Sequence, residues 1–225
     1  MKKFIHHLHE GLVDVKYGPL TQEDESKIDL SDKFITHFKK TGILERYKKH
    51  KMPSAQQTHQ ELKELQTIMA DATDDDLKFA LNAEVDEKEM YRKFAKSIGL
   101  HLSSHFIDDI FNQTDPILFY LKKHYDRARP EQFANANNIP FQVEISSNAM
   151  HPACPSGHAL DSYLMEYVLT KLSPSNSIQI KEFCKKMRES RNNVGLHYMS
   201  DNEMSRMLAT DIISSGLLKF PGENI

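Results

Sequence analysis

The chain has 225 residues, a formal net charge of -3 at pH 7 and a pI near 6.5. This length is enough to bury one sizeable hydrophobic core, so we expect a single domain over residues 1–225. A nucleic-acid-binding domain would be strongly basic, which argues against that class of partner, and no apolar run approaches the roughly 18 residues of a membrane span. Cys154 and Cys184 have no metal-binding spacing, so we expect two free thiols.

The first 30 residues are polar and weakly periodic, and we interpret them as an N-terminal arm. Its three clustered histidines, His6, His7 and His9, lack a cysteine or carboxylate partner, so we predict no metal site there. The opening segment also lacks the uninterrupted apolar run of a secretory signal, which leads us to expect a cytoplasmic protein.

Apolar residues recur at helical spacing along most of the remaining chain. Ser54 with Gln57, and Ser200 with Glu203, have the spacing of capping boxes that open helices. We therefore expect an all-α, single-domain helical bundle with its active site between helices. The helices around that site are predicted at residues 86–113, 116–128, 156–171, 176–192 and 201–216.

The predicted helix 116–128 presents two cations along one edge of its apolar stripe. These are Lys122 and Arg129, seven residues apart, whereas Arg127 points the other way on the helical wheel. By itself this pattern is more typical of surface cations whose stems lie along apolar surface.

The residues after Pro130 contain no strong helical period, and we expect 131–154 to form a wall of the site. Ser156 and Gly157 then open the predicted helix 156–171. The first amides of a helix have no intrahelical partners and the dipole is positive there, so backbone alone can hold an anion, with glycine allowing close approach. The same sequence also suits a simple turn and cap.

The stretch SRNNVGLHYMSD, residues 190–201, combines an arginine, a histidine and an aspartate. Arg191 lies on an apolar helix face, so an anion must meet it, either a bound oxyanion or a protein carboxylate such as Asp211. Gly195 offers a helix stop, which places His197 in the corner between two helices. Asp201, four residues on, can hold one ring nitrogen of His197 and leave the other free, the layout of an oriented nucleophile or base.

Taken together, the three segments resemble the tripartite signature of the type 2 phosphatidic acid phosphatase superfamily, which includes vanadium haloperoxidases and soluble acid phosphatases. LKKHYDRARP, CPSGHAL and SRNNVGLHYMSD carry every specified position in the right order between Lys122 and Asp201, while the first hundred residues carry none. The surroundings are most similar to the class A nonspecific acid phosphatases. Cys154 before PSGH departs from their pattern and leaves the shape of the pocket open.

The resemblance implies a metal-independent phosphomonoester hydrolase that works through a phosphohistidine, with a mildly acidic pH optimum. His197 would attack phosphorus, Asp201 would fix its tautomer, and His158 would protonate the leaving alcohol and then activate water. No cofactor is implied, vanadate would inhibit, and the partner would be a small phosphorylated substrate. Relatives commonly oligomerise and are often exported, which leaves a homo-oligomer and export open. The phosphate-binding residues would be Lys122, Arg129, Ser156, Gly157 and Arg191.

Two other functions compete with this one. A vanadate-dependent haloperoxidase would hold vanadate as its cofactor in the same residues, with His197 bonded to vanadium, although known members tend to be considerably longer. A non-catalytic helical protein could instead bind phosphate or a phosphorylated ligand. Against it stands the pair of His197 and Asp201, because holding an anion needs cations and amides but no second, oriented histidine.

Overall fold

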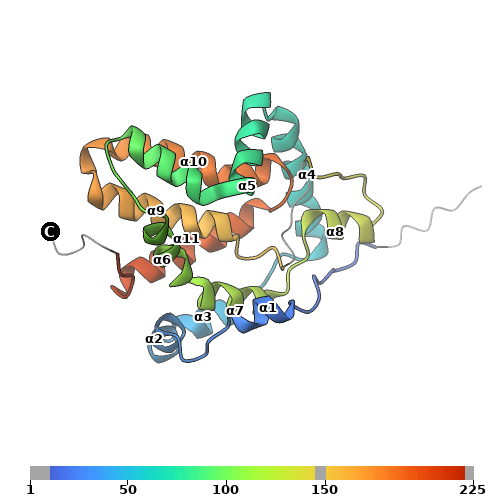
Figure 1. Ribbon diagram of the computed structural model, residues 1–225. Coiled ribbons are helices and arrows are strands. Elements are labelled where there is room, and N and C mark those ends of the chain that lie inside the picture. Colours follow the sequence, from blue (N-terminus) through green and yellow to red (C-terminus); the bar gives the residue numbers. More distant parts are fainter. Residues whose placement is uncertain (1–10, 145–150, 221–225) are drawn as a thin grey trace, which may run out of the picture.

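The computed structural model describes residues 11–144 and 151–220, and these consist of helices joined by loops (Figure 1). The expected all-α fold is confirmed, because the β pairing in these ranges amounts to one isolated bridge between Lys16 and Arg127. Within the described ranges, no helix is both long and apolar enough to cross a membrane. The α-helices are α1 (Gln22–Ser26), α2 (Lys33–Thr41), α3 (Ile43–Lys49), α4 (Ala55–Asp71), α5 (Asp74–Ser97), α6 (Ser104–Asn112), α7 (Asp115–Tyr125), α8 (Pro130–Ala136), α9 (Gly157–Leu172), α10 (Ser177–Asn193) and α11 (Met199–Ser214), with a short 3-10 turn, η1 (Pro174–Asn176), before α10.

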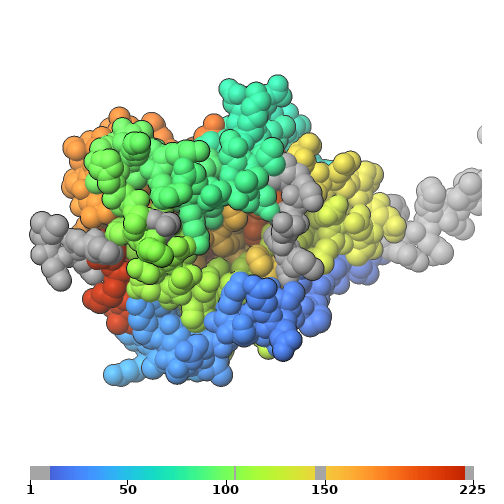
Figure 2. Space-filling model, viewed as in Figure 1, coloured from blue at the N-terminus to red at the C-terminus, as the bar shows by residue number. Residues whose placement is uncertain are grey.

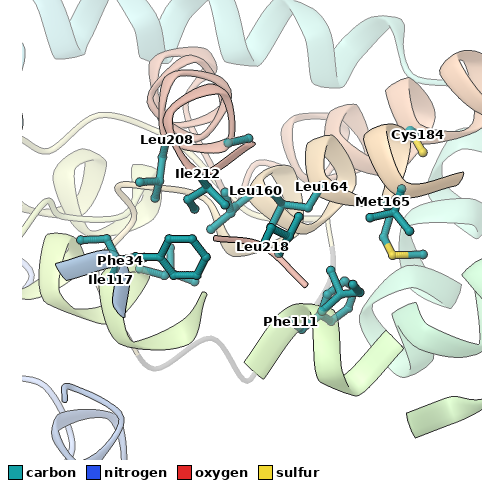
Figure 3. Close-up of a cluster of buried hydrophobic side chains, with 14 of the residues drawn as sticks. Phe34, Phe111, Ile117, Leu160, Leu164, Met165, Cys184, Leu208, Ile212 and Leu218 are labelled. Carbon is teal, nitrogen blue, oxygen red and sulfur yellow. The ribbon is translucent and has the colours of Figure 1, made fainter. Parts of the chain in front are cut away.

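Helix α9 packs most extensively against the last two helices of the chain. It lies against α10 and α11, and α5 packs on α10 (Figure 1). Its side chains Leu160, Leu164 and Met165 are fully buried and meet Leu208 and Ile212 of α11 in one core (Figure 3). Each fully buried side chain of this kind stabilises the fold by about 1.5–3 kcal/mol. The first turn of α9 is therefore fixed in space by the core behind it.

The predicted helix 86–113 is wrong in its bounds. The helix begins earlier, at Asp74, passes a kink at Asp86 (φ -156, ψ 80) and ends at Ser97. Gly99 then adopts a left-handed conformation (φ +82), and the Ser103 hydroxyl caps α6. One periodic stretch is thus two helices, because apolar spacing alone does not reveal where the backbone turns.

The predicted helix 116–128 also ends sooner than expected. Asp126 takes a left-handed conformation (φ 49), and its N–H bonds to the carbonyl of Lys122, which closes α7 at Tyr125. Arg129 lies beyond this end, as the residue before α8, rather than on the edge of α7. Arg127 lies in the intervening loop and is buried, so the prediction that it points away is wrong.

Of the two expected capping boxes, the one at Ser54 and Gln57 is confirmed and the other is not. The last helix is capped by Asp201, whose carboxylate accepts the backbone N–H of Tyr198 at 3.0 Å. The predicted free thiols, Cys154 and Cys184, are both present and buried.

Parts of the sequence predictions fall outside the described residues. His6, His7 and His9 lie there, as do residues 145–150 of the expected wall. The described part of the expected arm is held to the loop after α7, since the backbone N–H of Tyr17 bonds to the carbonyl of Asp126 at 3.0 Å.

Candidate active site

The site begins with His197, in the loop between α10 and α11. Its Nδ1 lies 3.2 Å from Oδ2 of Asp201, and its Nε2 lies 2.8 Å from Nη1 of Arg129. An ionised carboxylate can only accept and a guanidinium can only donate, so Nδ1 carries the proton and Nε2 carries the lone pair. Burial, with Arg129 beside it, lowers the pKa of His197 well below its usual value, and the ring is neutral. The expected pairing with Asp201 is present.

Asp201 is itself held by a cation that the sequence prediction missed. Nη1 of Arg127 donates to Oδ1 of Asp201 at 2.6 Å and to the Ser200 hydroxyl at 2.7 Å, while Nη2 donates to Glu61 at 2.5 Å. Burial would raise the pKa of Asp201, but Arg127, His197 and the N–H of Tyr198 together lower it well below its usual range. Asp201 therefore stays ionised and keeps His197 in one tautomer.

Arg129 reaches His197 from the start of α8. Besides His197, its guanidinium donates to the carbonyls of Leu196 and His151 at 3.0 and 3.1 Å, and to Nδ1 of His151 at 3.1 Å. Burial lowers the pKa of Arg129 to about 10, so it remains a cation at neutral pH. Burial, Lys122 and Arg129 also hold the pKa of His151 well below its usual range, so its ring is a neutral acceptor. His151 is a second residue of the site that the sequence prediction did not identify.

Lys122 is the most enclosed cation of the site. It is fully buried, and its Nζ donates to the carbonyls of Pro152 and Pro155 at 2.8 and 2.5 Å. Burial, with Arg129 nearby, lowers the pKa of Lys122 to about 7. Neither Lys122 nor Arg129 forms an ion pair with any residue in the described ranges. In the described part of the chain the two cations donate to neutral acceptors alone, which is costly unless an anion joins them.

The start of α9 lies next to these side chains. Ser156 is the N-cap, its hydroxyl accepts the N–H of Ala159 at 3.4 Å, and its own N–H bonds to the carbonyl of Asp201 at 3.4 Å. Gly157 is the first residue of the helix. Figure 2 shows orange atoms of the α9 region at the bottom of a hollow, between the teal atoms of the α4 and α5 region and the blue and green atoms below.

Arg191 lies on α10, and the partner predicted for it was wrong. Its Nη2 pairs with Glu84 of α5, whereas Asp211 bonds to Arg46 and to the hydroxyl of Tyr47. Nε and Nη1 of Arg191 are buried and have no hydrogen-bond partner among the residues that the structure describes. A buried donor without an acceptor destabilises the fold by about 1–3 kcal/mol, so an anion that accepted these two hydrogen bonds would bind favourably.

His158, at the second position of α9, is turned toward α5. Its Nε2 lies 3.4 Å from Oε2 of Glu87, and the ring also hydrogen-bonds the backbone of Ala83. Burial, Arg191 and His197 lower the pKa of His158 well below its usual value. In the unliganded site this ring is therefore neutral, contrary to the protonated state that an acid in mildly acidic solution requires.

The structure brings most of the predicted residues together, although contacts are made directly only between some of them. His197 contacts both Asp201 and Arg129, and the backbone N–H of Ser156 bonds to the carbonyl of Asp201. His158 and Arg191 instead contact two residues of α5, Glu87 and Glu84 respectively. The missed residues are Arg127, His151 and the acidic residues Glu61, Glu84 and Glu87. For these missed residues the sequence offered one local indication: Glu84 and Glu87 are three residues apart, which places two carboxylates on the same face of a helix.

A scan against models of known protein families finds none that matches this chain. Within the described residues, no group of three or more histidine, cysteine, aspartate or glutamate side chains is arranged to hold a metal ion.

Proposed function

We propose that this protein hydrolyses phosphate monoesters through a phosphohistidine at His197, without a metal ion and with a mildly acidic optimum. One observation carries the proposal. Nε2 of His197, the ring nitrogen with the lone pair, lies 2.8 Å from Nη1 of Arg129, a buried guanidinium that has no carboxylate partner in the described part of the chain. Nucleophilic attack on a phosphate needs both a free electron pair and cations that neutralise the oxygens around phosphorus.

Substrate binding would exchange hydrogen bonds rather than create a site anew. A phosphate oxygen would take over the Arg129 donor that now bonds to His197, and other oxygens would accept from Nε and Nη1 of Arg191. Lys122 and the start of α9 would supply further positive charge. The anion would raise the pKa of Lys122 and keep it protonated.

In the first chemical step, Nε2 of His197 would form a bond to phosphorus while the bond from phosphorus to the alcohol oxygen breaks. The leaving oxygen would take a proton delivered by His158. Asp201 would hold the remaining proton on Nδ1 and stabilise the positive charge on the ring. Water, deprotonated through His158, would then attack phosphorus, break the nitrogen–phosphorus bond and release inorganic phosphate.

The test is hydrolysis of p-nitrophenyl phosphate from acidic to mildly alkaline pH, with EDTA and with or without vanadate. We expect turnover that vanadate inhibits and that His197→Ala abolishes, while phosphate still raises the Tm of the variant. The exposed His101 provides a matched control, and His101→Ala should keep full activity.

Two other outcomes would overturn the proposal. Phosphate binding with no turnover at any pH would favour the non-catalytic binding protein. Oxidation of bromide by the vanadate-loaded protein, in the absence of phosphatase activity, would favour the haloperoxidase.

A further inference from the structure

The acid–base histidine of the site has an unassigned neighbour on α5. Oε2 of Glu87 lies 3.4 Å from Nε2 of His158, and the Glu87 side chain is only 14% exposed. Oε1 of the same carboxyl is buried and has no hydrogen-bond partner within residues 11–144 and 151–220. A buried carboxylate with an unsatisfied oxygen is costly, whereas a carboxylic acid that donates to a neutral imidazole is not.

The charges around Glu87 favour this protonated form. The charges of Arg191 and Lys88 lower the pKa of Glu87, and the charge of Glu84 raises it. Burial, with Glu87 nearby, raises the pKa of Asp161 on α9 well above its usual value. Burial outweighs the two cations and raises the pKa of Glu87 to about 8. A proton therefore rests on the carboxyl at neutral pH, next to a histidine whose own pKa is lowered well below its usual value.

We propose that Glu87 is the proton reservoir of the site and acts through His158, as a positioning residue that never touches the substrate. The inference rests on the proposed phosphatase function. It accounts for how a histidine that is neutral at rest can serve as a general acid. As the bond between phosphorus and the alcohol oxygen breaks, the Glu87 carboxyl gives its proton to Nε2 of His158. The imidazole leaves its hydrogen bond with the Ala83 backbone and gives its Nδ1 proton to the leaving oxygen. When water attacks the phosphohistidine, its proton returns through His158 to the Glu87 carboxylate.

The position of Glu87 also explains why α5 belongs to the site. Glu84 and Glu87 lie on either side of the kink at Asp86, and each contacts one residue of the sequence signature. Glu84 pairs with Arg191, and Glu87 faces His158. Helix α5 thus contributes the ion-pair partner of Arg191 and, under our proposal, the proton donor to His158, although it lies outside the signature segments.

The test compares two substrates whose leaving groups differ in their need for a proton. The p-nitrophenolate anion leaves without protonation, whereas ethoxide from ethyl phosphate requires an acid. Glu87→Gln keeps the shape of the side chain but cannot supply a proton. We expect it to lower kcat/KM for ethyl phosphate by about 10²-fold or more while changing that for p-nitrophenyl phosphate by less than about threefold. His158→Ala should likewise lower kcat/KM for ethyl phosphate more than that for p-nitrophenyl phosphate, and adding Glu87→Gln to it should not lower this ratio further.

Wild-type protein gives a second readout. The ratio of kcat/KM for ethyl phosphate to that for p-nitrophenyl phosphate should stay constant between about pH 7 and 8, where both esters are dianions, and fall above it, as Glu87 loses its proton. Lys122 affects both substrates alike and cancels in this ratio. In Glu87→Gln the fall should disappear. Glu89→Gln is the matched control, because Glu89 lies on the same helix in ion pairs with Arg92 and Lys93.

The possible failures are distinguishable. Equal losses on both substrates, or no loss on either, would overturn the role of Glu87 while the phosphatase function stands. A wild-type protein that hydrolyses neither substrate would overturn the proposed function and this inference with it. Thermal unfolding of each variant separates loss of fold from loss of proton supply.

Discussion

Replacing Arg127 should be the most damaging single change near the site, although Arg127 is not a signature residue. Its guanidinium is 6% exposed and compensates two carboxylates, Asp201, which is fully buried, and Glu61, which is 17% exposed. Its flat face also lies 4.1 Å from the ring of Tyr198. Arg127→Met keeps much of the apolar contact and removes the charge. Removing one partner of a buried ion pair costs about 3–5 kcal/mol, because the other charge stays buried and unpaired.

The free energy of unfolding can be measured in urea at neutral pH. A loss of this size should lower the urea midpoint by about 1 M or more. Arg206→Met is the matched control, since Arg206 pairs with Glu203 on α11 with both side chains more than half exposed, at 52% and 55%. An exposed pair of this kind contributes at most about 1 kcal/mol.

The pH dependence provides a sharper test. Because the folded-state pKa of Asp201 lies below its unfolded value, this group stabilises the fold above about pH 4, and the stabilisation is lost as pH falls through the folded pKa. Arg127 is the strongest of the contributions that lower this pKa. The stability difference between wild type and Arg127→Met should therefore narrow as pH falls below about 4. A loss no larger than that of Arg206→Met, or a difference that does not change with pH, would refute the reasoning.

Two further predictions concern Lys122 and Gly195. Because the pKa of Lys122 is about 7 in the unliganded site, inhibition by sulfate, whose charge is constant in this range, should weaken by up to about tenfold per pH unit above pH 7. Lys122→Met should bind sulfate weakly with no such step, and a wild-type affinity independent of pH would contradict the argument. Gly195→Ala should lower the free energy of unfolding by about 1–2 kcal/mol, because φ is +80 and the added Cβ would lie 2.9 Å from Met69 and 3.0 Å from Phe141. Gly42→Ala, at φ +77 with no atom within 4 Å, isolates the backbone strain and should cost less in the same urea titration.

The pairing of His197 with Asp201 was predictable because it is local. Four residues separate them, and the intervening turn into α11 fixes their geometry with little help from the rest of the chain. The resemblance led us to expect Arg129 near His197. The helical wheel, however, placed Arg129 on the helix that carries Lys122, which is wrong. Arg129 reaches His197 from beyond the end of α7, where helical spacing no longer applies.

The partners of the signature residues were not predictable, because they come from distant parts of the chain. Arg191 and Glu84 are 107 residues apart, and Arg127 and Glu61 are 66 apart. The first hundred residues contain many acidic side chains, and the sequence alone does not indicate which of them pairs with Arg191. Only the packing of α5 on α10 selects Glu84.

The charged residues of the site fall into two groups: those with an oppositely charged partner in the protein and those without one in the described residues. Asp201 and Arg191 have oppositely charged partners within the protein, Arg127 and Glu84, so the fold stabilises them without a ligand. Lys122 and Arg129 have only neutral acceptors in the described residues, and one of these is Nε2 of His197, which accepts from Arg129. A purely structural cluster would be expected to compensate all of its buried charges, because uncompensated ones are costly. Under the proposed function, a bound phosphate would compensate both cations, so an oxyanion that binds here should stabilise the fold as well as occupy the site.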